Sequence, residues 1–173
     1  MMRPALAILL STAALAAAGS APGEPCATAG RHDFDFVIGN WLVRDASGRA
    51  VATATIARAY AGCVLVETWL GAGSGRQSLG VIGFEPEDGE GEDGIWRREF
   101  LGSDGVVLSL AGRVHGAAMV MTGKEYRPEG VRGNRVTWRP RSDGTVEMRW
   151  ETSAADGASW QDRSREVFHR IAE

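Results

Sequence analysis

Two charged residues that stand among apolar residues of predicted strands are the strongest candidates for binding chemistry. Glu67 lies within residues 63–70, and Arg98 lies within residues 95–101. A charged side chain in an apolar interior is costly unless it pairs with an opposite charge or with a polar group of a ligand. We therefore expect Glu67 and Arg98 to point inward and to orient a small molecule. An inward pair with a purely structural role fits the same pattern.

The chain also holds six tryptophans, a residue type that offers a broad apolar surface and one N–H donor. Tryptophans that line a cavity together with a few polar groups describe a small-molecule site. The predicted ligand-binding residues are Glu67, Trp69, Trp96, Arg98, Trp138 and Trp150. The alternative is that most of these rings pack the core and close its ends.

Motifs for metal binding and catalysis are missing from the sequence. The histidines His32, His115 and His169 are far apart, with no His-x-His or His-Glu-x-x-His spacing. The serine within residues 71–75 lacks the strand–turn–helix context of a nucleophile elbow. We therefore predict no metal, no cofactor and a non-catalytic protein that binds an apolar or amphipathic small molecule. Two other uses stay open: an enzyme that works in the same cavity, haem-dependent or isomerase/hydrolase-like, and a structural envelope protein with a filled core.

The first residues indicate export. Residues 1–20 read as a signal peptide, with the charge of Arg3 first, an apolar run of Ala, Leu and Ile next, and small residues around Ala18 and Ala21 that suit cleavage. The apolar run is shorter than the about 20 residues that a membrane-spanning helix needs. We predict one domain over residues 21–173, periplasmic or secreted, with no membrane span after cleavage.

Charge and cysteine content add to this interpretation. The net charge of the whole chain is −3, and loss of Arg3 with the leader makes the rest more negative, which excludes a typical nucleic-acid binder. Cys26 and Cys63 are the two cysteines, and an even pair in an oxidising compartment predicts a disulfide. Two free thiols, one of them buried at the start of a strand, are the alternative.

Short β-rich runs separated by glycine-containing turns recur along the rest of the chain. They predict ten strands at residues 39–44, 51–60, 63–70, 77–84, 95–101, 106–114, 117–125, 135–139, 145–152 and 159–169. Consecutive hairpins imply antiparallel neighbours, and closure removes the two exposed edges of so long a sheet. The predicted fold is all-β, an antiparallel up-and-down β-barrel of about ten strands with a short N-terminal helical turn. Residues 126–134 are predicted as a loop over one barrel mouth, and the acidic, glycine-rich residues 85–94 as a flexible turn.

A resemblance supports the barrel. Phe34, Asp35, Phe36, Gly39 and Trp41 match an FDF-x-x-G-x-W opening, and residues 62–69 and 136–138 add further matching pieces. On these motifs the chain resembles an exported bacterial family of unknown function that is similar to calycins, the lipocalin and fatty-acid-binding-like barrels. A more distant similarity to nitrobindin-like barrels implies His169 as a haem ligand. The alternation of His169 with Gln161, Arg163 and Arg165 instead places it on a solvent-exposed face.

Overall fold

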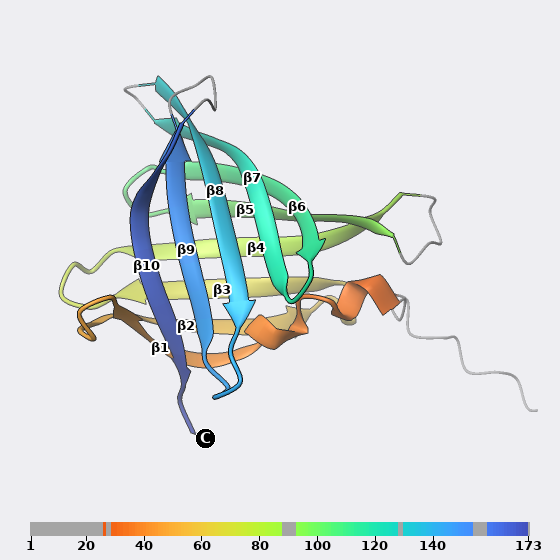
Figure 1. Cartoon of the computed structure of the whole chain (residues 1–173), viewed down its shortest axis with the longest axis horizontal. Helices are drawn as coiled ribbons and strands as arrows, with labels where there is room; N and C mark the ends of the chain where they lie inside the picture. Colours follow the sequence, from red (N-terminus) through yellow and green to blue (C-terminus); the bar gives the residue numbers. More distant parts are fainter. Residues whose placement is uncertain (1–25, 27–28, 88–92, 128–129, 154–158, 173) are drawn as a thin grey trace, which may run out of the picture.

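The computed structural model of the chain is a closed barrel of ten antiparallel strands (Figure 1). It describes residues 26, 29–87, 93–127, 130–153 and 159–172, so the predicted signal peptide lies outside the described residues. The strands are β1 (Gly39–Asp45), β2 (Ala50–Ala59), β3 (Val64–Gly71), β4 (Gln77–Pro86), β5 (Gly94–Gly102), β6 (Val107–His115), β7 (Ala118–Arg127), β8 (Gly130–Pro140), β9 (Val146–Ser153) and β10 (Trp160–Arg170). Each strand pairs with its neighbours in the chain, and β1 pairs with β10. The predicted up-and-down barrel is confirmed.

One predicted loop is wrong. Every strand except β8 begins within one residue of its predicted start, but β7 runs to Arg127 and β8 begins at Gly130. Tyr126 pairs with Val131 there, so residues 126–134 form a hairpin rather than a loop over the barrel mouth. Of the predicted acidic turn, residues 88–92 lie outside the described residues.

Alternation along the strands builds the core. In β9, Val146 and Met148 are buried and face inward, while Glu147 between them faces outward. The same period of two repeats in β5, where Trp96, Arg98 and Phe100 are all buried. Inward-facing residues from all ten strands therefore fill the barrel except where a cavity remains.

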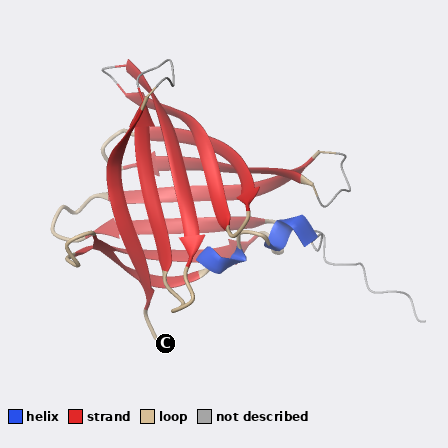
Figure 2. Ribbon diagram, in the orientation of Figure 1, coloured by secondary structure: helices blue, strands red, loops and turns tan. Residues whose placement is uncertain are grey.

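The N-terminal segment closes one end of the barrel. It consists of two 3-10 helices, η1 (Ala29–His32) and η2 (Asp35–Val37), which confirm the predicted helical turn (Figure 2). Phe34 lies between them, is 1% exposed, and packs edge-on against Trp96 and Trp138 from β5 and β8. We call this the plugged end, which includes the turns β2–β3, β4–β5, β6–β7 and β8–β9. We call the opposite end the cavity end.

No helix among the described residues is long and apolar enough to cross a membrane.

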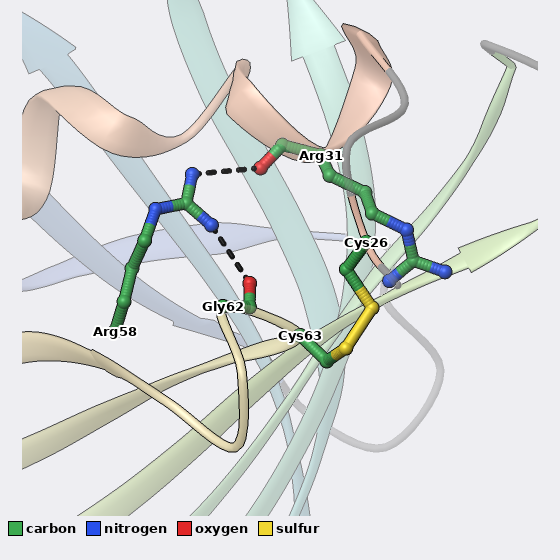
Figure 3. The surroundings of a disulfide bond; sticks show 5 residues. All are labelled: Cys26, Arg31, Arg58, Gly62 and Cys63. Atoms are coloured by element: carbon green, nitrogen blue, oxygen red, sulfur yellow. Dashed lines mark hydrogen bonds between the residues drawn. A yellow bond between two sulfur atoms is a disulfide. The ribbon is translucent and has the colours of Figure 1, made fainter. Parts of the chain in front are cut away.

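A disulfide joins the N-terminal segment to the barrel, as predicted. Cys26 bonds to Cys63 in the β2–β3 turn, with the two Cα atoms 5.1 Å apart (Figure 3). Beside it, Arg58 donates hydrogen bonds to the carbonyl oxygens of Gly62, at 2.8 Å, and Arg31, at 3.3 Å (Figure 3). Arg58 also pairs with the carboxylate of Asp35. A covalent bond and an arginine thus fix the same segment at the plugged end.

Candidate ligand-binding cavity

A cavity of about 210 Å³ lies inside the barrel toward the cavity end. Its apolar wall consists of Trp69, Phe100, Val136, Met148 and Trp150. Its polar wall consists of Glu67, Arg76, Arg98, Arg163, Ser164 and Glu166. Strands from both halves of the chain and the β3–β4 hairpin contribute to it, so the site exists only once the barrel has closed.

The predicted pair is formed. Arg98 donates to Oε2 of Glu67 from Nε at 3.1 Å and from Nη2 at 2.7 Å, and the two side chains are 5% and 7% exposed. The Arg98 guanidinium also lies over the rings of Phe100 and Trp138. Two charges so deeply buried offset their desolvation only through such close hydrogen-bonded pairing.

A glycine makes room for the pair. Gly80 on β4 is the direct neighbour of Glu67, and a Cβ at position 80 would lie 2.9 Å from Glu67 Oε2. Any larger residue at this position would push the carboxylate away from Arg98.

A second polar cluster lies around Arg163, which lines the same cavity. The sequence analysis did not predict this cluster. Arg163 donates to the fully buried Glu125 at 2.8 Å and lies 4.2 Å from the centroid of the Trp150 ring. The Trp150 indole N–H donates to Asn134 at 2.5 Å. Simple alternation places Arg163 outside, but the β9–β10 register shifts between Asp162 and Ser164. This bulge directs Arg163 toward the cavity.

Arg76 and Glu166 form a third polar group with a different character. The Nε and Nη2 atoms of Arg76 and the Oε2 atom of Glu166 are buried and have no hydrogen-bond partner among the described residues. Asp104 Oδ2 lies 3.0 Å from Arg76 Nε and balances its charge, but outside hydrogen-bond geometry. Burial raises the pKa of Glu166 above its usual value. Buried polar atoms without partners are rare and call for a functional or structural explanation.

The structure brings together four of the six predicted ligand-binding residues. Glu67, Trp69, Arg98 and Trp150 line the cavity. Trp96 and Trp138 face inward but lie toward the plugged end, where they pack against Phe34. Trp138 still touches the site indirectly, because its ring lies under Arg98.

His169 lies away from this cavity. Its neighbour Phe168 is buried in the core, so the half-buried His169 faces the outside of β10, next to Leu42 of β1. An iron ligand at His169 would therefore sit outside the barrel interior. Among the described residues no group of three or more histidine, cysteine, aspartate or glutamate side chains is placed to hold a metal ion.

No protein-family model matches the chain, and no curated protein matches it either. The resemblance to an exported bacterial family therefore depends on the motif residues alone. The geometry of the cavity carries the functional argument.

We expect Glu166→Gln to stabilise the protein at neutral pH. Because the pKa of Glu166 is raised by burial from its ordinary 4.5, the wild-type protein loses stability as the pH rises through that raised pKa. Glutamine does not ionise, so the variant keeps this stability. Urea unfolding at several pH values should show a gain at pH 8 that disappears near pH 4. A gain of equal size at both pH values would contradict the assignment.

Proposed function

We propose that the protein is an exported binding protein that holds a small amphipathic molecule in the barrel cavity. The observation that carries this proposal is the combination of internal space, an aromatic wall and a buried charge pair at one place. Trp69 and Trp150 offer flat apolar surface, while Glu67 and Arg98 fix polar groups at defined positions. Small-molecule sites have this make-up, mostly apolar with a few placed polar groups.

The cavity favours binding over the filled-core alternative. A barrel whose role is only structural needs no internal space, whereas this one keeps about 210 Å³ beside charged side chains. Ligand pockets for drug-sized molecules have about 300–1,000 Å³, so the space suits a compound smaller than these. The ligand that we propose is therefore about the size of one or two rings.

Export is supported by two features of the chain. Residues 1–20 have the composition of a signal peptide. The Cys26–Cys63 disulfide belongs to oxidising compartments such as the periplasm or the exterior of the cell. We propose that the mature protein works in one of these compartments.

A second candidate function is acid–base catalysis in the same cavity. It is favoured by Glu166, whose pKa is raised by burial and which lines the space where a ligand would lie. Perturbed carboxyl groups of this kind are frequent at active sites. Turnover of a bound compound that stops in Glu166→Gln, with binding retained, would establish this alternative.

The binding proposal predicts that 1-naphthol enters the cavity and quenches tryptophan emission. Glu67→Gln should weaken this binding about tenfold, equivalent to about 1.4 kcal/mol, because Arg98 loses its charged partner and no longer holds its position. Fluorescence titration gives both dissociation constants, and a thermal melt checks that the variant is folded.

Glu147→Gln is the matched control, since Glu147 lies on the outer face and pairs there with Arg141. It should leave the dissociation constant unchanged. Absence of quenching in the wild-type protein, or equal weakening in both variants, would contradict the proposal.

A further inference from the structure

Two arginines of this protein, Arg98 and Arg135, hold carboxylates through the edge that Nε and Nη2 form. Arg98 donates to Glu67 from Nε and Nη2, and Arg135 on the outer face donates to Glu151 from the same two atoms, at 2.7 and 2.9 Å. These two N–H groups are parallel, so they match the two oxygens of a carboxylate. In Arg76 the same two atoms are buried without a hydrogen-bond partner among the described residues.

Glu166 offers a complementary group in the same cavity. Its Oε2 atom is buried and has no hydrogen-bond partner among the described residues, and it lines the cavity together with Arg76. Without a ligand, the Nε–Nη2 edge of Arg76 and the Oε2 atom of Glu166 both lack a hydrogen-bond partner among the described residues, which is unfavourable for buried polar groups. A ligand with an acidic head would satisfy both.

We propose that the cavity takes a small carboxylic acid, whose carboxylate binds the Nε–Nη2 edge of Arg76 and hydrogen-bonds to Glu166. This inference rests on the proposed binding function and names its ligand class. The apolar body of the acid lies against Phe100, Met148 and Trp150, which line the same space. A volume of about 210 Å³ suits a single ring or a short branched chain.

The proton balance of the complex follows from the two adjacent carboxyl groups. Like charges at such close range do not both ionise, so Glu166 keeps its proton and donates it to the ligand carboxylate. The surroundings of Glu166 favour this state: it is largely buried, and it lies opposite Asp45 of β1, whose negative charge disfavours a second one. A hydrogen bond with the Ser164 side chain and the positive charges of Arg163 and Arg76 oppose this effect and lower the pKa of Glu166. On β9 its direct neighbour is the uncharged Met148.

The remaining charges that line the cavity are already paired. Arg98 is held by Glu67, and Arg163 is held by Glu125. Arg76 faces Asp104 across 3.0 Å, but its Nε–H and Nη2–H groups have no hydrogen-bond partner among the described residues, so they are the donors that the ligand carboxylate would use.

The test uses isothermal titration with benzoate, benzyl alcohol and benzylamine, which share one ring and differ in the charge of the head group. Benzoate should bind at least about tenfold more tightly than either of the others at pH 6, a difference of about 1.4 kcal/mol. Its affinity should fall as the pH rises from 6 through the raised pKa of Glu166, because Glu166 loses the proton that it shares with the ligand. Benzoate stays ionised over this range, so the change reports on the protein.

Two variants separate the roles of the two residues. Arg76→Gln should weaken benzoate binding at least about tenfold and leave benzyl alcohol unaffected, since only the charged head uses the donor edge. Glu166→Gln should bind benzoate with no dependence on pH between 6 and 8. Arg97→Gln is the matched control, because Arg97 is the exposed neighbour of Arg98 on β5 and points outward.

The outcomes distinguish this inference from the proposed function. Equal affinity for benzoate and benzyl alcohol, or full benzoate binding by a folded Arg76→Gln variant, overturns the carboxylic-acid class and leaves cavity binding intact. Failure of 1-naphthol and all three single-ring probes to bind overturns both proposals.

Discussion

Replacing Phe34 by alanine should lower the free energy of unfolding by about 3–5 kcal/mol, the usual loss for a buried phenylalanine. The ring is 1% exposed, and its centroid lies 5.7 Å from that of Trp96 and 5.4 Å from that of Trp138. Removal of the ring would leave a cavity against the two tryptophans at the plugged end. Guanidinium unfolding, followed by tryptophan emission, measures the loss.

Phe36→Ala is the matched control. Phe36 is half-buried and meets Phe34 edge-on at 5.3 Å, but it does not reach the tryptophans of the barrel through any ring contact in the described residues. Its loss should be smaller, about 1–2 kcal/mol for partly buried apolar surface. If Phe34→Ala cost no more than Phe36→Ala, the N-terminal segment would not be part of the core.

The barrel was predictable because the signals for it are local. Alternation such as that of Val146, Met148 and Trp150 can be recognised within a few residues. Turns such as Asp143-Gly144 mark where the chain reverses between two strands. Gly144 has a φ of +82°, which shows why a glycine ends this turn. The first half of β8 carries no such signal, because Gly130, Arg132 and Gly133 do not alternate between apolar and polar. Pairing with β7 makes that half a strand.

The charged pair was predictable for a different reason. Glu67 interrupts an apolar run, and Arg98 alternates with the apolar Trp96 and Phe100, so their inward placement follows from the faces that their neighbours occupy. Arg163 and Glu166 lie in β10, where charged residues occupy both faces and a bulge shifts the alternation. Arg76 lies in a hairpin, whose side-chain directions have no periodic rule. These three residues enter the cavity through tertiary geometry that no local pattern encodes.

The position of a residue along the barrel axis was also not predictable from the sequence. Trp96 and Arg98 share one face of β5, yet the two-residue step of about 7 Å along the strand separates the plugged end from the cavity. Period-two patterns give the face of a residue and not its level. Tryptophans at inward positions therefore divide between packing Phe34 and lining the cavity.

Loss of the Cys26–Cys63 disulfide should lower the free energy of unfolding by about 4 kcal/mol, because the bond closes a long loop in the unfolded chain. The two cysteines are 37 residues apart, and the closed loop holds both helical turns, β1 and β2. The Cys26→Ser/Cys63→Ser variant should therefore unfold at lower guanidinium concentration. Wild-type protein in excess dithiothreitol should show the same midpoint as the variant.

Arg58 should hold the N-terminal segment in place after the disulfide is lost, so its substitution serves as the control for this prediction. Arg58 pairs with Asp35 and donates hydrogen bonds to the carbonyl oxygens of Arg31 and Gly62. These contacts do not involve the disulfide, so the reduced protein should keep its N-terminal segment in place. Tryptophan emission of the folded variant should then match that of the wild type, with Phe34 still packed against Trp96 and Trp138. The Arg58→Gln variant tests this, because its emission should shift toward that of exposed tryptophan when the disulfide is also reduced. An unchanged midpoint on reduction, or two alkylatable thiols in freshly isolated exported protein, would show that the bond does not contribute to the native fold.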